Sequence, residues 1–140
     1  MSAIEIEGLD HVVIRASNLE RSLAFYCGAL GCTEERRIDS LGLVQLRAGA
    51  ALIDLVDIEA PLGQAGGAAP GKEGRNMDHF AIALAAFDQV AIRAQLTAAG
   101  VGDDRIGDVG QRYGAQGNGP SMYIRDPDGN VVELKGPPSE

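Results

Sequence analysis

A short segment that occurs twice is the feature that most constrains how this chain can fold. Residues 9–16 read LDHVVIRA and residues 77–84 read MDHFAIAL, so each copy places an Asp-His pair near the start of an apolar run. A segment with helical spacing follows each copy and ends at a glycine, Gly31 in the first and Gly100 in the second. The two histidines are 68 positions apart (79 − 11) and the two glycines are 69 apart (100 − 31). The near-equal spacing of two different features predicts an internal duplication.

Each copy of the duplicated unit is predicted to begin with a strand, continue with a helix and end with further strands. The opening runs are rich in β-branched residues, and the helical segments place apolar residues on one face. The first unit is expected to have strands at 9–16, 33–40, 43–47 and 51–57 with a helix at 19–30, and the second to have strands at 77–84, 105–109, 121–125 and 131–135 with a helix at 88–99.

The length of 140 residues predicts a single domain, with module 1 at about 8–57, a linker at 58–76 and module 2 at about 77–136. The linker has too much Gly and Pro for regular structure, and we expect it to join the modules and to cover part of a pocket. The formal net charge of -8 argues against nucleic acid or an anionic membrane as a partner. The sequence lacks a signal-peptide pattern and a long apolar run, which predicts a cytoplasmic protein with no membrane partner.

Three side chains form a candidate metal site. His11 and His79 are the only histidines in the chain and occupy equivalent positions of the two units. Glu133 lies between Val132 and Leu134 in a predicted core strand, where a carboxylate is costly unless it has a partner. Two histidines and one carboxylate suit an octahedral divalent ion that keeps open positions for a substrate. The alternative is that both histidines are bonded to backbone groups in the core and that Glu133 ends a strand.

The repeated strand, helix and strand order resembles the vicinal oxygen chelate superfamily, which includes glyoxalase I, fosfomycin-resistance enzymes, extradiol dioxygenases and bleomycin-binding proteins. The matching stretches are Asp10-His11, residues 22–26 with Leu30-Gly31, Asp78-His79 and residues 126–133. The resemblance implies an α+β fold of two βαβββ modules, which form a pair of curled β-sheet half-barrels with flanking helices. It also implies metal ligands at His11, His79 and Glu133.

Asp54 stands where glyoxalase I has a fourth ligand, which is normally Glu. Asp is one methylene shorter, so three alternatives stay open: Asp54 binds the metal directly, binds it through water, or does not bind it. Of these alternatives, we favour Asp54 as a ligand or a close neighbour of the metal. If Asp54 binds the metal, the ligand set is glyoxalase-like. If it does not, the three remaining ligands form the set of the dioxygenases and the fosfomycin-resistance transferases.

Arginines and hydroxyl-bearing side chains near these ligands are the candidates for substrate binding. The resemblance places Arg15 and Arg75 where glyoxalase I holds the carboxylates of glutathione, and a guanidinium binds a carboxylate in bidentate fashion. The other candidates, which lead into the last strands, are Arg112, Tyr113, Ser121 and Tyr123.

The resemblance predicts an enzyme that uses one divalent metal ion per site (Ni, Co, Zn, Mn or Fe), with glutathione as a candidate co-substrate. The expected reaction is a glyoxalase-I-like isomerisation, formally a lyase reaction, in which Glu133 or Asp54 removes a proton next to a polarised carbonyl of a small anionic substrate. The alternatives are an Fe(II) extradiol-type dioxygenase, a fosfomycin-resistance-like transferase and a non-catalytic ligand-binding member. The expected assembly is a homodimer, whose modules pair either within one chain or between two chains.

Overall fold

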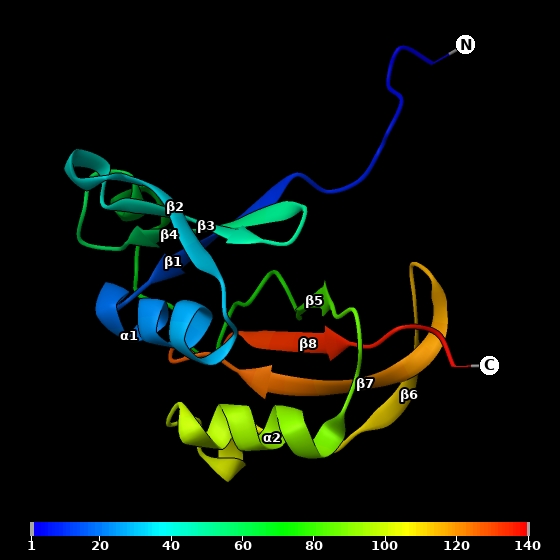
Figure 1. Ribbon diagram of the computed structural model, residues 1–140. Coiled ribbons are helices and arrows are strands. Elements are labelled where there is room, and N and C mark those ends of the chain that lie inside the picture. The colour runs from blue at the N-terminus through cyan, green and yellow to red at the C-terminus, as the bar shows by residue number, and fades with distance from the viewer. Residues whose placement is uncertain (1, 140) are drawn as a thin grey trace.

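Two four-stranded mixed sheets form the fold of this chain, which a computed structural model describes over residues 2–139 (Figure 1). Met1 and Glu140, the two ends of the predicted single domain, lie outside the described residues. The predicted α+β fold of two repeated units is confirmed, because each sheet follows the same strand order and neither sheet closes into a barrel. Within residues 2–139, no helix is long and apolar enough to span a membrane.

The first half of the chain forms the sheet with strand order β1-β4-β3-β2, and the second half forms the sheet with order β5-β8-β7-β6. In each sheet the first strand runs parallel to the last, and the other pairs are antiparallel. The strands are β1 (His11–Ala16), β2 (Thr33–Ile38), β3 (Leu43–Ala48), β4 (Ala51–Asp57), β5 (Phe80–Ala83), β6 (Gly110–Gly114), β7 (Gly117–Arg125) and β8 (Val131–Lys135).

One helical segment accompanies each sheet, and an aspartate or asparagine begins each of them. The Asn18 side chain accepts a hydrogen bond from the backbone of Arg21, and the Asp88 side chain accepts one from Ala91, both at 3.0 Å. The glycines that were expected to end these segments, Gly31 and Gly100, have positive φ values of 83° and 88°. The helical elements are α1 (Leu19–Leu23), the π-helical turn η1 (Ala24–Ala29), η2 (Asp39–Leu41), η3 (Gly63–Gly66), α2 (Gln89–Ala98) and η4 (Asp103–Arg105).

A single hydrophobic core joins the two halves, because the inward faces of both sheets pack against α1, η1 and α2. Alternate residues of β1 point into this core, and Ile14 and Ala16 are buried. The Gln95 side chain of α2 donates a hydrogen bond of 2.9 Å to the carbonyl of Ala29 in η1. The helices therefore hold the two sheets together and leave the opposite face of each sheet open.

Candidate metal centre

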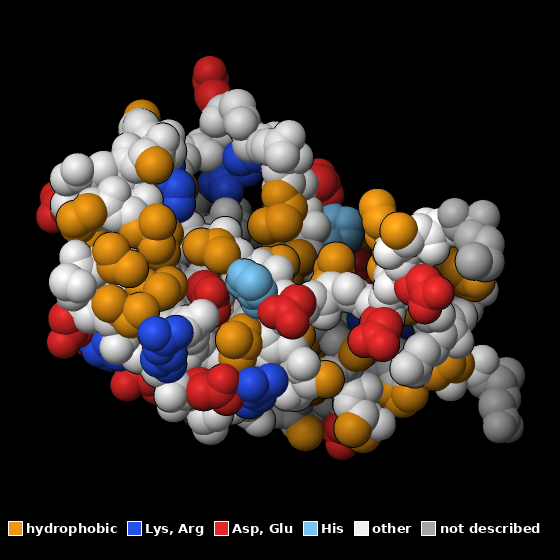
Figure 2. All heavy atoms as spheres, turned by 90° about the horizontal axis from the view of Figure 1, so that it is seen from above, with side chains coloured by type: hydrophobic (Ala, Val, Ile, Leu, Met, Phe, Trp, Pro, Cys, Tyr) orange, Lys and Arg blue, Asp and Glu red, His pale blue; other side chains and the backbone are white. Residues whose placement is uncertain are grey.

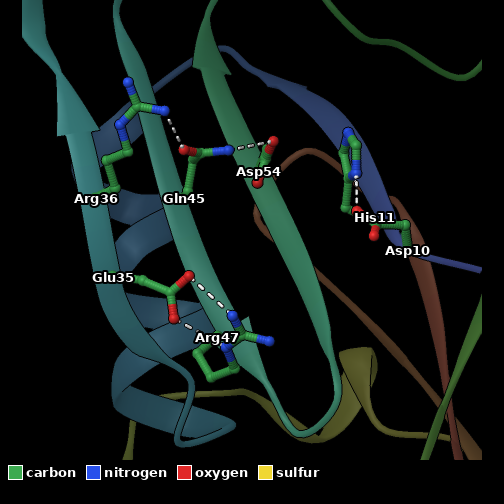
Figure 3. A network of polar contacts seen from close by, with 7 residues as sticks. All are labelled: Asp10, His11, Glu35, Arg36, Gln45, Arg47 and Asp54. Carbon is green, nitrogen blue, oxygen red and sulfur yellow. Dashed lines mark hydrogen bonds and ion pairs between the residues drawn. The ribbon is translucent and has the colours of Figure 1, made fainter.

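The open face of the first sheet holds two of the predicted ligands, His11 and Asp54. In the β1–β4 register Val13 lies opposite Asp54, and His11 lies two residues before Val13 on the same face of the strand. Figure 3 shows the two side chains projecting from neighbouring strands on this face. The carboxylate of Asp54 is also close enough to contribute to the raised pKa of His11.

The carboxylate of Asp54 is buried and only half satisfied. Asp54 is 3% exposed, and its Oδ2 accepts a hydrogen bond of 3.1 Å from Nε2 of Gln45 on the adjacent strand β3. Its Oδ1 is buried without a hydrogen-bond partner. An unpaired buried carboxylate oxygen costs free energy, and a bound cation removes that cost. Asp54 and His11 therefore fit one side of a divalent metal site.

The second sheet presents the other two predicted ligands in contact with each other. Nε2 of His79 and Oε1 of Glu133 are 3.1 Å apart, and Glu133 is 6% exposed. Glu133 lies on β8 opposite Ala81 of β5, so its side chain shares a face with His79, which stands two positions before Ala81. Imidazole nitrogen and carboxylate oxygen are common ligands of divalent transition metals, so this pair fits the second side of such a site.

Both histidines are oriented by the aspartate that precedes them. Nδ1 of His11 lies 2.6 Å from Asp10 Oδ1, and Nδ1 of His79 lies 2.7 Å from Asp78 Oδ2. A carboxylate on Nδ1 fixes the ring orientation and leaves Nε2 as the ligand atom, an arrangement that is frequent at metal-binding histidines.

The hydrogen bond that His11 donates to the Asp10 carboxylate raises the pKa of His11 above its usual 6.5, with a smaller contribution from the charge of Asp54. Because the folded protein binds this proton more tightly, the contact stabilises the fold below pH 6.5, and the effect is lost as the pH rises through the folded pKa.

We expect Asp10→Asn to lower the pKa of His11 in the metal-free protein, measured by an NMR titration of the imidazole protons. Asp108→Asn, at an exposed position, is the control, and an unchanged His11 pKa in Asp10→Asn would contradict the assignment.

The four predicted ligands lie in two separate pairs, one on each sheet. Among residues 2–139, no three or more His, Cys, Asp or Glu side chains come together as a metal site. Figure 2 shows the face on which both histidine side chains, in pale blue, are visible from the same direction. One chain therefore presents two half-sets of ligands and does not combine them.

The predicted substrate arginines Arg15 and Arg75 both hold loops in place. Arg15 donates from Nε to Gly63 O (2.9 Å), from Nη1 to Ala68 O (3.0 Å) and from Nη2 to Gly67 O (2.6 Å). Arg75 donates to the Asn130 side chain at 3.0 Å and to the carbonyl of Asp128 at 2.7 Å. Arg15 thus fastens the linker over the open face of the first sheet, and Arg75 fastens its exit to the turn before β8.

Three of the other predicted substrate residues form a cluster beside His79. The ring of Tyr123 lies edge-on to His79 with centroids 5.1 Å apart, and the guanidinium of Arg112 lies 4.4 Å above the same ring. Nη1 of Arg112 donates to the Ser121 hydroxyl at 2.8 Å and to its carbonyl at 2.9 Å. Tyr113, by contrast, lies near the end of β6 and is 81% exposed.

Two residues that the sequence analysis did not single out also belong to these faces. Lys135 lies opposite Ser121 in the β7–β8 register, is 9% exposed and donates to the Gly136 carbonyl at 3.1 Å. Gln45 lies opposite Asp54 and binds it. The alternation of β8 was a signal for Lys135, which is two residues after Glu133. Gln45 needed the register of β3 and β4, which the sequence does not contain.

A cavity of about 850 Å³ lies between the edge strands of the two sheets. Both histidines line it, together with apolar side chains such as Leu52, Ile82 and Leu96. A cavity of this size and lining is typical of sites that bind small molecules.

Neither cysteine has the environment of a nucleophile. Burial raises the pKa of Cys32 to about 11, and burial also raises the pKa of Cys27. Both side chains therefore remain thiols at neutral pH, since reactive cysteines need a lowered pKa.

The sequence and the fold of this chain are similar to those of known proteins. The model of the Glyoxalase/Bleomycin resistance protein/Dioxygenase superfamily matches residues 8–134. A comparison with curated proteins finds no match. A virulence protein from Salmonella typhimurium is 25% identical with a TM-score of 0.69, and the match covers 96% of this chain and 100% of that one.

Two further solved structures share the fold at lower identity. A glyoxalase/bleomycin resistance protein/dioxygenase from Alicyclobacillus acidocaldarius is 19% identical with a TM-score of 0.63, over 95% of this chain and 93% of that one. A lactoylglutathione lyase from Agrobacterium tumefaciens is 21% identical with a TM-score of 0.59, over 94% of each chain.

Proposed function

Because this chain belongs to the Glyoxalase/Bleomycin resistance protein/Dioxygenase superfamily, we propose that it is a divalent-metal-dependent enzyme of the glyoxalase I type. The observation that carries the proposal is the pair of half-sets, each with one histidine beside one buried carboxylate. In the first half-set an oxygen of Asp54 has no partner, and in the second Glu133 lies against His79. Together they supply two imidazole nitrogens and two carboxylates, a ligand set for Ni, Co, Zn, Mn or Fe as the divalent ion.

The complete site forms between two chains of a homodimer in this proposal. Within residues 2–139, one chain does not bring its half-sets together, and both histidines are visible from the same side of the molecule (Figure 2). That face includes Val13, which is 52% exposed although it lies in the middle of a strand. A two-fold dimer that covers this face places module 1 of one chain against module 2 of the other. Each site then takes His11 and Asp54 from one chain and His79 and Glu133 from the other.

The residues of the site divide the work of an isomerisation between them. His11, Asp54, His79 and Glu133 would hold a divalent ion, which would supply polarisation of a substrate carbonyl when bound. Glu133 or Asp54 would remove a proton from the hydroxyl-bearing carbon next to the carbonyl and return it to the former carbonyl carbon. The hydroxyl proton would pass to the former carbonyl oxygen, so that the product is an isomer of the substrate. Both carboxylates are buried, so the site excludes water from the proton transfer.

The cations near Glu133 support a small anionic substrate. Arg112 on β6 and Lys135 on β8 lie on either side of β7. Arg112 donates to Ser121 of β7, which lies opposite Lys135 in the register. In this proposal Arg112, Ser121 and Tyr123 contact the substrate, and Tyr113 contacts it from the end of β6. Arg15 and Arg75 shape the site through the linker, and glutathione is a candidate co-substrate. The apolar cavity beside the histidines takes the carbon skeleton.

The metal site is tested first on metal content. We expect the purified protein to bind Co(II), Ni(II) or Zn(II) tightly. His79→Ala removes a ligand and its contact to Glu133, so it is expected to lose high-affinity binding, a larger effect than the about 10- to 100-fold cost of removing an outer partner of a ligand. Calorimetric titration of folded dimers measures the dissociation constant. Gln111→Ala, at an exposed position of β6, is the control. Equally weak binding by wild type and His79→Ala at every reconstitution rules out the metalloenzyme.

Turnover assays separate the proposed reaction from the alternatives. Conversion of the methylglyoxal–glutathione hemithioacetal supports the isomerase, and oxygen uptake with catechols and Fe(II) supports an extradiol dioxygenase. The second candidate is transfer of a thiol to an anionic epoxide, which the cations Arg112 and Lys135 favour. Loss of the free thiol from solution would detect this reaction. Tight binding of a ligand without any of these turnovers marks a binding protein.

A further inference from the structure

We propose that Gln45 is a positioning residue that holds Asp54 in the orientation in which one of its carboxylate oxygens is free to bind a metal ion. The inference rests on the proposed function and extends it to a residue that does not itself bind the metal. Three observations support it: the cross-strand register, the direction of the Gln45 amide and the satisfaction of the two Asp54 oxygens.

The register places three polar side chains side by side across the first sheet. Arg36 of β2 lies opposite Gln45 of β3, and Gln45 lies opposite Asp54 of β4. Directly opposed residues in antiparallel strands have neighbouring side chains on one face of the sheet. Figure 3 shows this row, in which each side chain points towards the next.

The contacts along the row give the Gln45 amide a direction. Its Oε1 accepts a hydrogen bond of 3.5 Å from Nη1 of Arg36, and its Nε2 donates one of 3.1 Å to Oδ2 of Asp54. A guanidinium only donates and a carboxylate accepts, so the reversed amide would place donor against donor and acceptor against acceptor. Arg36 therefore keeps the donor side of Gln45 towards Asp54.

The hydrogen bond distinguishes the two oxygens of Asp54. Oδ2 is occupied by Gln45, whereas Oδ1 is buried and unpartnered. Asp has a short side chain, and with Oδ2 held at its place the carboxylate has little freedom to turn. Hydrogen bonds of this kind orient metal-binding carboxylates, and their removal commonly weakens metal binding about 10- to 100-fold.

The test replaces Gln45 by Met, which has a similar length and no amide donor. We expect Gln45→Met to bind Co(II) about 10-fold more weakly than wild type by calorimetry. The visible absorption spectrum of the bound Co(II), which reports its ligands, is expected to change. Gln111→Met makes the same replacement on exposed β6 and is expected to leave both measurements unchanged.

A pair of compensating variants tests the hydrogen bond itself. Gln45→Asn shortens the donor by one methylene, so it is expected to lose affinity as Gln45→Met does. Gln45→Asn combined with Asp54→Glu restores the summed length of the two side chains, and we expect it to recover affinity and the wild-type Co(II) spectrum. A residue that merely packed in the sheet would give no such recovery.

The outcomes separate this inference from the proposed function. Wild-type affinity and spectrum in folded Gln45→Met, with weakened binding in Asp54→Ala, overturn the inference alone. Unchanged binding in Asp54→Ala overturns the inference, because Asp54 is then not a ligand, and leaves the three-ligand site. A wild-type protein that binds no Co(II) overturns the proposed function and the inference together. Weakened binding in Gln45→Met and Gln45→Asn, with recovery in the double variant, supports both.

Discussion

Heterodimers of His11→Ala and His79→Ala chains are expected to contain one high-affinity metal site per dimer, about half the wild-type number, although neither variant alone forms such a site. The two variants damage different half-sets, one on each sheet. If each site takes its half-sets from two chains, both lesions fall in one site of the heterodimer. The other site then receives the intact half-set of each chain.

The experiment requires heterodimers free of either homodimer. Co-expression of the two variants with different affinity tags, followed by purification on both tags, provides them. Counting tight Co(II) sites by calorimetry gives a result that does not depend on the substrate. Pairing of the half-sets within one chain would give no high-affinity site, because every chain carries one lesion. Co-expressed His11→Ala chains with two tags serve as the control.

Asp126→Ala is expected to destabilise the protein by about 3 kcal/mol, since it leaves one buried donor and three partly buried donors without their acceptor. Asp126 is 2% exposed and accepts four hydrogen bonds. Three come from the turn before β8, from the backbone of Asp128 and from the backbone and side chain of Asn130, and the fourth comes from the hydroxyl of Tyr26 at 2.8 Å. Tyr26 lies in η1, so this carboxylate joins the turn of the second half to the helical segment of the first half.

Urea denaturation measures the free energy of unfolding for this comparison. Tyr26→Phe removes one of the four donors and keeps the aromatic ring, which lies edge-on to Phe25, so we expect a smaller loss of about 1 to 2 kcal/mol. Asp108→Ala, at an exposed position, is the control and is expected to change the stability by less than about 0.5 kcal/mol. A loss in Asp126→Ala no greater than that of Asp108→Ala would show that the joint contributes little to folding.

Much of the fold follows from local sequence patterns, and the elements that differ from the predicted ones do so for local reasons. The capping residues and the glycines at the helix ends lie where the sequence places them, because these effects act within one turn of the chain. The helix expected over 19–30 continues beyond Leu23 as a π-helical turn. The strand expected at 105–109 is reduced to a single bridge between Ile106 and Ile124, and β6 forms instead at Gly110–Gly114, where the glycine content obscured the strand pattern.

The sequence by itself determined the duplication, which depends on the spacing of repeated residues along the chain. The superfamily followed from a resemblance in particular stretches, such as Asp78-His79 and residues 126–133. Only the tertiary structure decided that the Asp-His segments carry two half-sets, one on each sheet. It also placed Gln45 against Asp54 and Tyr26 against Asp126. Such contacts depend on strand register and on the packing of sheets through the helices, which join residues as far apart as Tyr26 and Asp126 and leave no periodic trace in the chain.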